Sequence, residues 1–276
     1  MQDQSIAFIG CGAMGGALAK AVCKQINPKQ VFLTDISPQK AEDLAKELGA
    51  NVLASPQEAV KTARWLILCT KPQTVTEVLG DLAPILKEEQ EKGRDKILCS
   101  ILAGVTIQSL SSLINLDQQA ILRLMPNTPV AIGKGLGFIA TNQWLTEKDK
   151  TQFLTLFSQI GSLSFLEEDL FDQATVLSSC APAYVYQFIE YLTDAGVHMG
   201  LSKETAQHFV THAVYGSASM VIESGKTPRQ LRDMVTSPGG STIEGVRVLE
   251  EEGVGLAPLL KKAAMASFKR NQELGQ

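Results

Sequence analysis

The sequence of 276 residues lacks the features that mark several specialised classes of protein. It has no apolar run approaching the roughly 20 residues that a membrane helix requires. Its opening stretch, MQDQSIAFIG, has no basic segment followed by an apolar one, so no secretory leader is expected. Aromatic residues are only 6% of the chain, and the net charge is −4 without a basic stripe. We therefore expect a soluble globular protein with neither a membrane nor a nucleic-acid partner.

Cysteine is scarce, and its pattern excludes a disulfide framework. The five cysteines are odd in number and scattered, and none forms a CxxC pair. This favours reduced thiols in the cytoplasm, where most would be small buried residues rather than nucleophiles. The residues concerned are Cys11, Cys23, Cys69, Cys99 and Cys180.

Histidine is equally scarce, with three residues in the chain. His208 and His212 would share one side of a helix, but they lack the third ligand and the HExxH pattern of a metal site. No metal is therefore expected, and the pair is interpreted as surface or interface histidines.

The first part of the chain alternates apolar strands with amphipathic helices, which predicts a parallel sheet covered on both faces. Strands are expected at 6–10, 31–35, 65–69, 97–104 and 120–126, with helices at 15–26, 38–49, 56–63 and 74–86. Further strands at 135–141 and 162–166, and a helix near 147–159, are expected at the sheet edge.

Strand signals stop near residue 168, and helical patterns follow at roughly 181–198, 203–224 and 255–274. The second pattern has one apolar face rich in small residues, which fits either core packing within a subunit or a subunit interface. That face is formed by Ala206, Phe209, Val210, Ala213, Val214, Ser217, Met220 and Val221. The predicted fold is an α/β Rossmann domain with a doubly wound, mainly parallel sheet (1–166), followed by an all-α domain (167–276).

A glycine-rich turn follows the first predicted strand. GCGAMG (10–15) matches G-x-G-x-x-G and opens a predicted helix, which is the context that dinucleotide binding requires. Gly10 permits a tight turn, Gly12 leaves space for a pyrophosphate, and Gly15 allows close helix packing. The anion would rest on the helix N-terminus. The expected cofactor-binding residues here are Gly10, Cys11, Gly12, Ala13, Met14 and Gly15.

Asp35 ends the second predicted strand, where an acidic side chain accepts the ribose hydroxyls of NAD and repels a 2′-phosphate. Ser37, Gln39 and Lys40 follow and offer groups that bind a phosphate. The choice between NADH and NADPH therefore stays open, as does a simple role for Asp35 as a turn residue.

Three more turns are expected at the carboxyl edge of the sheet, where open α/β folds bind ligands. Thr70, Lys71 and Pro72 would line the nicotinamide side, although a solvated lysine at a helix start fits nearly as well. Ala103 and Gly104 end the next strand. Asn127, in MPNTP, suits recognition of the cofactor amide or a purely structural turn.

The stretch TSPGGSTIEG (236–245) interrupts the helical region. Ser241 and Glu244 fit a capping box, and the two glycines would expose backbone N–H groups at the helix start. From these residues alone the stretch predicts an anion site or a structural cap.

Several segments together resemble the pyrroline-5-carboxylate reductases over nearly the whole chain. They are GCGAMGGAL, LCTKPQ, LAGVTI, RLMPNTP, APAYVYQFIEYLTDAGVHMGL and LRDMVTSPGGSTIEGVRVLEEEG. The resemblance implies reduction of Δ1-pyrroline-5-carboxylate to L-proline with NADPH or NADH, the last step of proline biosynthesis. It also implies a homodimer through interlocked helical domains, with further assembly into a ring of dimers.

The same resemblance assigns roles in the substrate site. Thr242 would hydrogen-bond the ring nitrogen, orienting the imine and relaying a proton with water. Ser237 and the N–H groups of Gly239, Gly240, Ser241 and Thr242 would bind the carboxylate. Two departures stand out: Ala181 replaces a glycine common before the proline of this segment, and Asp35 replaces groups that hold a 2′-phosphate.

Two other functions would share part of this pattern. A β-hydroxyacid dehydrogenase would carry a lysine on the first long helix of the second domain, but 181–200 contains none. A non-catalytic dinucleotide-binding regulator would not need SPGGST alongside the glycine turn.

Overall fold

The computed structural model describes residues 4–274, which form two compact units. Among the described residues, the first comprises 4–179 together with 271–274, and the second comprises Cys180–Arg270. The chain returns to the first unit at Asn271, whose Nδ2 donates to the carbonyl of Asp172 over 3.4 Å. The division lies later in the chain than the predicted domain boundary at 166, which stays a prediction.

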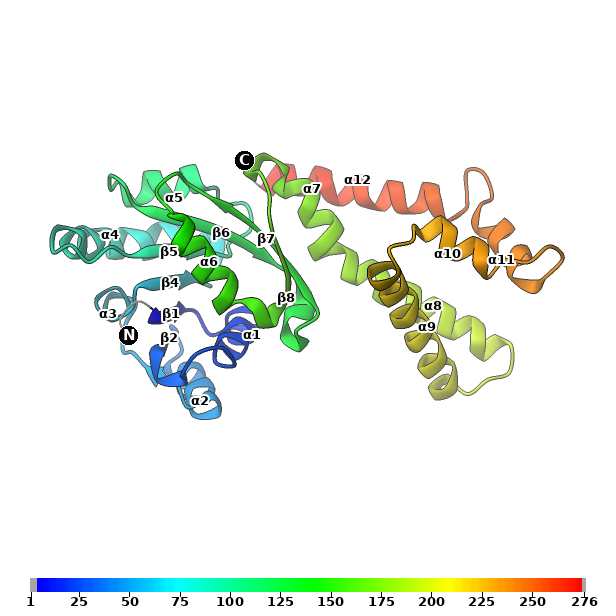
Figure 1. Cartoon of the computed structure of the whole chain (residues 1–276), viewed down its shortest axis with the longest axis horizontal. Coiled ribbons are helices and arrows are strands. Elements are labelled where there is room, and N and C mark those ends of the chain that lie inside the picture. The colour runs from blue at the N-terminus through cyan, green and yellow to red at the C-terminus, as the bar shows by residue number, and fades with distance from the viewer. Residues whose placement is uncertain (1–3, 275–276) are drawn as a thin grey trace. The chain divides into compact units, whose positions relative to one another are not determined.

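The first unit contains an eight-stranded sheet in the order β3-β2-β1-β4-β5-β6-β7-β8 (Figure 1). All neighbouring strands are parallel except β6 and β7, which run antiparallel. The strands are β1 (Ile6–Ile9), β2 (Val31–Thr34), β3 (Asn51–Val52), β4 (Trp65–Leu68), β5 (Ile97–Ser100), β6 (Ala120–Pro126), β7 (Gly135–Thr141) and β8 (Gly161–Phe165).

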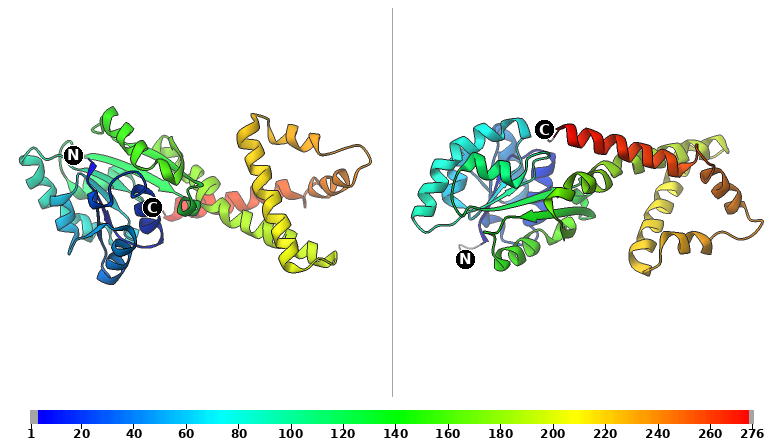
Figure 2. Two further views of the ribbon diagram at one scale, coloured as in Figure 1. Left: turned by 60° about the horizontal axis from the view of Figure 1, so that its bottom comes forward. Right: turned by 90° about the horizontal axis from the view of Figure 1, so that it is seen from above.

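Helices cover both faces of this sheet, as the two further views show (Figure 2). They are α1 (Ala13–Val22), α2 (Pro38–Leu48), α3 (Pro56–Thr62), α4 (Val75–Glu91), α5 (Ile107–Ile114), α6 (Glu147–Leu156) and α7 (Phe171–Thr175). Because successive strand residues point to opposite faces, Ile6 and Phe8 of β1 enter one core while Ala7 and Ile9 enter the other. The doubly wound Rossmann prediction is confirmed.

The order of the strands reverses between β1 and β4, because β2 and β3 lie on one side of β1 while β4 to β8 lie on the other. In open α/β sheets, a ligand crevice forms outside the carboxyl ends of the strands at such a reversal. The turns after β1, β2, β4, β5 and β6 lie at this edge and are therefore the candidates for ligand binding.

The predicted elements differ from the structure in a few places. The strand expected at 97–104 ends at Ser100, and a loop with Gly104 at φ +75° follows before α5. The helix expected from residue 15 already begins at Ala13. The two-residue strand β3 was not expected, because so short a pairing leaves no periodic pattern.

The second unit is entirely helical, as predicted. Its helices are α8 (Ala181–His198), α9 (Lys203–Ser224), α10 (Pro228–Met234), α11 (Ser241–Leu249) and most of α12 (Leu256–Leu274). In Figure 1, α8 and α9 lie side by side. They approach closely at Gly196, where an added Cβ would lie 2.8 Å from the Cβ of Ala206.

Most apolar side chains of this unit are exposed in the single chain. On the predicted apolar face of α9, only Ala206 is buried, while Phe209 and Met220 are 59% and 49% exposed. On α8, Tyr186 and Tyr191 are about 60% exposed. The predicted apolar face of α9 is therefore not covered by core packing within the single chain.

Between residues 4 and 274, no helix combines the length and apolar character needed to cross a bilayer.

Candidate functional site

The glycine turn after β1 has the backbone geometry that the motif predicts. Gly10 has φ +110°, and a side chain there would meet the carbonyl oxygen of Cys69 at 2.5 Å. A Cβ on Gly15 would lie 2.2 Å from the carbonyl oxygen of Gly10, so this glycine lets α1 pack against the turn. Gly12 is the N-cap of α1 and faces open space, with no side-chain hydrogen bond to the helix end. The N–H groups of the first turn are thus available to an anion.

Asp35 lies beside this turn. Its Oδ2 accepts the backbone N–H of Cys11 over 2.7 Å, and its Oδ1 accepts the N–H of Ser37 over 2.9 Å. The carboxylate is therefore held at the carboxyl end of β2, and each oxygen keeps acceptor capacity for a further donor.

A hollow of about 510 Å³ adjoins the turn. The residues lining it are Cys11, Gly12, Ala13, Gly16, Ala17, Lys20, Lys40, Leu44 and Ala131. Lys20 is paired with Glu47 over 2.8 Å. Ala131 was not predicted, because it comes from the 3₁₀-helix Thr128–Ile132 far along the chain and carries no motif.

Three thiols lie around the glycine turn and strands β4 and β5, and none is activated. Burial, with the negative charge of Asp35 adding to it, raises the pKa of Cys11 to about 12. Burial likewise raises the pKa of Cys69 and Cys99 well above the usual value. These cysteines are protonated near neutral pH and act as small packing residues, in line with the expectation.

The turns after β4 and β5 reach the same edge. Thr70 carries a buried hydroxyl oxygen without a hydrogen-bond partner in the described structure. Lys71 is exposed and precedes a 3₁₀-helix that begins at Pro72. Ala103 and Gly104 are exposed in the loop after β5. A donor without a partner at a ligand edge is a group that a bound molecule can satisfy.

Asn127 follows β6, and its side-chain amide already makes two hydrogen bonds within the protein. Its Nδ2 donates to the carbonyl of Ser178 over 3.0 Å, and its Oδ1 accepts the N–H of Leu136 over 2.9 Å. These two bonds fit the alternative in which Asn127 is a structural turn residue. One N–H of Nδ2 and one lone pair of Oδ1 remain for the predicted contact with the cofactor.

In the helical unit, the stretch 237–242 forms the start of α11. Gly239 has φ +72°, a conformation that favours glycine, and a Cβ on Gly240 would lie 2.6 Å from the Oγ of Ser237, so that side chain would have to move. Thr242 is exposed in the first turn of the helix. No side chain caps this helix end, which leaves its first N–H groups for an anion.

The predicted capping box at Ser241 is wrong. Gly240 is the N-cap, and Ser241 is the first helical residue, so its hydroxyl is one position too late. Glu244 instead pairs with Arg247 over 2.7 Å. A true capping box occurs one helix earlier, between Thr227 and Gln230 at the start of α10.

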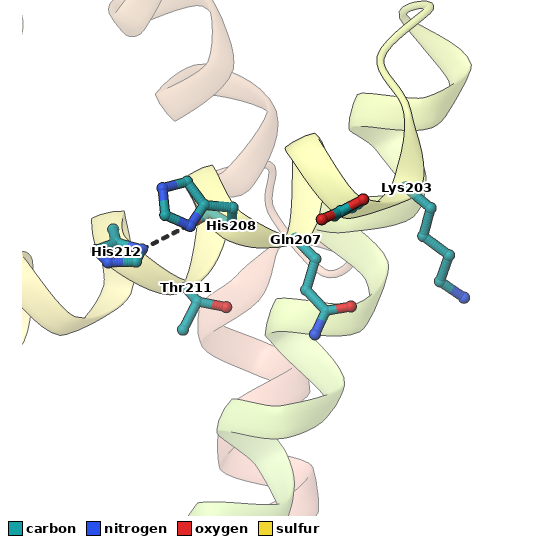
Figure 3. Close-up of a pocket in the computed structure, with 6 residues that line it drawn as sticks. Lys203, Gln207, His208, Thr211 and His212 are labelled. Atoms are coloured by element: carbon teal, nitrogen blue, oxygen red, sulfur yellow. Dashed lines mark hydrogen bonds between the residues drawn. The ribbon is translucent and has the colours of Figure 1, made fainter.

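His208 and His212 lie on the exposed surface of α9, in a shallow hollow of about 500 Å³ (Figure 3). Their ring centroids are 4.2 Å apart, and Nδ1 of His212 lies 2.8 Å from the carbonyl oxygen of His208. Within the part of the chain that the structure describes, no group of three or more histidine, cysteine, aspartate or glutamate side chains forms a metal cluster. The expectation of no metal stays a prediction.

Two family profiles match the chain, one over each part. Residues 5–104 match an NADP oxidoreductase, coenzyme F420-dependent profile, and residues 168–274 match a pyrroline-5-carboxylate reductase dimerisation profile. The second match begins close to the predicted domain boundary.

Whole-chain relatives agree with these profiles. The pyrroline-5-carboxylate reductase of Escherichia coli K12 is 37% identical over 276 residues, covering 99% of both chains. The crystal structure of Plasmodium falciparum pyrroline carboxylate reductase with NADP bound is 30% identical, with a TM-score of 0.86 and full coverage of both chains. The Coxiella burnetii pyrroline-5-carboxylate reductase structure has a TM-score of 0.90 at 28% identity, covering 99% of each.

The pyrroline-5-carboxylate reductase of Escherichia coli K12 and that of Pisum sativum, which is 35% identical over 98% of this chain, favour the main interpretation over either rival function. By its sequence and by its fold, this chain belongs to the pyrroline-5-carboxylate reductase family.

Proposed function

We propose that this protein reduces Δ1-pyrroline-5-carboxylate to L-proline by hydride transfer from a nicotinamide cofactor, as the last step of proline biosynthesis. Family membership supports the reaction as a whole. The structural observation that carries the proposal is that two glycine-containing turns, after β1 and before α11, each lead into a helix whose N-terminus has no side-chain cap. One suits the pyrophosphate of the cofactor, and the other suits the carboxylate of the substrate.

The residues of the first unit fit a dinucleotide. The pyrophosphate would rest on the N–H groups of Gly12, Ala13 and Met14, where the open space at Gly12 admits it. The turns bearing Thr70 to Pro72, and Ala103 with Gly104, would border the nicotinamide. The unpartnered hydroxyl of Thr70 supports this placement. When bound, the cofactor supplies the hydride.

We further propose that NADH is preferred. The Asp35 carboxylate is fixed by the N–H groups of Cys11 and Ser37, so it can accept ribose hydroxyls without moving. A 2′-phosphate would meet this negative charge at close range. Lys20 and Lys40 border the same hollow, but Lys20 is already paired with Glu47. That the Plasmodium falciparum structure holds NADP is a property of that protein.

The start of α11 would bind the substrate. Its first N–H groups and the Ser237 hydroxyl would hold the carboxylate, and the Thr242 hydroxyl would hydrogen-bond the ring nitrogen. A threonine hydroxyl is too weak an acid to protonate the nitrogen alone, so its part is to orient the imine and relay a proton with water. Fixing both groups places the imine carbon for hydride attack, and such positioning carries much of the catalysis.

The helical unit would form a homodimer. Its exposed apolar side chains, among them Phe209, Tyr215 and Ile222 on α9, need cover that a second copy can supply. The dimerisation profile over 168–274 supports this assignment. Assembly of dimers into a ring, and a cytoplasmic location, follow from the resemblance and from the five free cysteines as expectations only.

One assay tests reaction and cofactor together. Purified protein is given pyrroline-5-carboxylate with NADH or NADPH, and oxidation is followed at 340 nm, the wavelength at which both reduced cofactors absorb. We expect turnover with both and a higher kcat/KM with NADH. Absence of turnover with either cofactor, under conditions where cofactor binding is measured, would overturn the proposed reaction. A higher kcat/KM with NADPH would overturn only the cofactor preference.

A further inference from the structure

The chain leaves the first unit through a short π-helix, Val176–Cys180, which joins α7 to α8. Such π-turns are rare and frequently mark functional sites. In an α-helix the carbonyl of Ser178 would accept the N–H of residue 182. That residue is Pro182, which has no N–H, so the α-helical bond to the Ser178 carbonyl cannot form.

Asn127 donates a hydrogen bond to the Ser178 carbonyl, which Pro182 cannot do. Its Nδ2 donates to the Ser178 carbonyl over 3.0 Å across 51 positions of sequence. Its Oδ1 accepts the N–H of Leu136 at the start of β7, and its own N–H donates to the Leu136 carbonyl. One side chain therefore joins the end of β6, the start of β7 and the π-helix.

Neighbouring contacts hold the same segment to α7 and to the end of β6. Ser178 is 6% exposed, and its hydroxyl donates to the Ala174 carbonyl over 2.8 Å. The Ser179 hydroxyl lies 3.5 Å from the Pro126 carbonyl, next to Asn127. These contacts end where the first compact unit ends, at Ser179.

The beginning of the connecting segment is anchored as well. Oε1 of Glu168 accepts the guanidinium of Arg123 and the N–H of Ile107, each over 2.9 Å. Arg123 is buried within β6, and its guanidinium lies 4.7 Å from the ring centroid of Phe171. The connection from Glu168 to Ser179 is thus fixed to β6 at both ends.

We propose that Asn127 is a positioning residue for the reaction. By holding the Ser178 carbonyl, it fixes the turn after β6 and the π-helix to each other at the cofactor edge of the first unit, which keeps that edge in the geometry the reaction needs. The inference rests on the proposed function, in which α11 holds the substrate and the turns after β1 to β5 hold the cofactor. It assigns Asn127 a role other than direct recognition of the nicotinamide amide.

The variant Asn127→Asp removes the Nδ2 donor and keeps the Oδ1 acceptor for Leu136. We expect kcat to fall about tenfold, since small misplacements of reacting groups cost about that much or more. The Kd for NADH, measured by fluorescence, should stay within about twofold. Hydrogen exchange of the 176–186 segment should accelerate because its anchor is lost.

A matched control lies at the opposite edge of the sheet. Asn142 donates to the Gln119 carbonyl over 2.8 Å and accepts the N–H of Ile121 over 3.1 Å, so it joins β6 to β7 by the same chemistry. Asn142→Asp should lower thermal stability while leaving kcat and the exchange of 176–186 unchanged.

Rescue completes the test. Pro182→Ala supplies a helical N–H for the Ser178 carbonyl, so Asn127→Asp should cost much less kcat in that background, and the double variant should fold even where the single one does not. Equal losses in both backgrounds, or a double variant that fails to fold, would overturn the proposal. A raised Kd with unchanged kcat at saturation would make Asn127 a direct cofactor ligand instead. If the wild-type protein reduced no imine, the proposed function would fail, and the exchange measurement would still decide the anchoring role.

Discussion

The carboxylate of Asp35 is bonded to the backbone N–H of Cys11, so the acidic end of β2 and the glycine turn form one rigid piece. A carboxylate held in this way cannot swing aside to admit a phosphate on the ribose. Under the proposed function, we therefore expect Asp35 to be the side chain that sets the preference between NADH and NADPH.

Replacing Asp35 with serine should shift preference toward NADPH. The change removes the charge that repels a 2′-phosphate and leaves a hydroxyl that can donate to it. We expect the ratio of kcat/KM for NADH to that for NADPH to fall by about tenfold or more. Asp43→Ser, on exposed α2 nearby, removes a charge of the same sign and should leave the ratio unchanged. An unchanged ratio in Asp35→Ser would show that other groups select the cofactor.

Alanine at two glycines of the turn should separate folding from binding. Gly12→Ala meets no atom within 4 Å, so the variant should fold with an unchanged Tm and lose cofactor affinity, because its methyl group occupies the phosphate space. Gly15→Ala places a methyl group 2.2 Å from a backbone carbonyl oxygen and should destabilise the protein by about 1–3 kcal/mol. Calorimetry and NADH titration measure the two effects. The control Gly80→Ala, in the exposed part of α4, should fold and bind as the wild type does.

The Thr242 hydroxyl should matter for turnover and not for the cofactor. Thr242→Ala is expected to lower kcat on the order of 100-fold, the usual loss for a positioned proton-transfer partner, with the Kd for NADH nearly intact. Thr242→Ser keeps the hydroxyl and should recover most of the rate. A wild-type rate in the alanine variant would remove Thr242 from the site.

Glu89 should make stability depend on pH. Burial alone would raise the pKa of this carboxyl, but the cations of Lys96, Arg94 and Lys92 outweigh it, so the pKa lies below the ordinary value for a glutamate. Because the pKa of Glu89 is lower in the folded protein than in the unfolded one, its charge stabilises the fold at pH values above the unfolded pKa. This stabilisation is lost as the pH falls through the folded pKa.

The variant Glu89→Gln tests this at the amino edge of the sheet, away from the cofactor. At pH 7 it should destabilise the protein by about 3 kcal/mol, because the buried cation of Lys96, 3.5 Å away, loses its counter-charge. The difference from wild type should shrink steadily below pH 4.5, as followed by denaturant unfolding at several pH values. A difference independent of pH would assign the loss to packing.

The sequence predicted the parts of this protein whose chemistry is local. The glycine turn at Gly10, the acidic end of β2 at Asp35 and the helices α8 and α9 were predicted because spacing and periodicity within a few residues determine them. The strand and helix boundaries that differed were those at loops, such as the end of β5 at Ser100.

What the sequence could not predict depends on distant partners. The bond from Asn127 to Ser178 joins residues 51 positions apart, and nothing near either residue signals it. The capping box at Ser241 failed because Gly240 adopts the N-cap conformation first, and a pattern of letters does not reveal which of two adjacent residues does so.

The return of the chain at Asn271, which donates to the Asp172 carbonyl, has a practical consequence for anyone who shortens the gene. Deleting the last turn of α12 should destabilise the nucleotide-binding unit, although almost all of that unit comes from the first 179 residues. Residues 180–270 form an insertion within a split domain. An independent nucleotide-binding fragment should therefore be made by linking residue 179 to residue 271, because a simple truncation after 179 would remove the hydrogen bond from Asn271 to the Asp172 carbonyl.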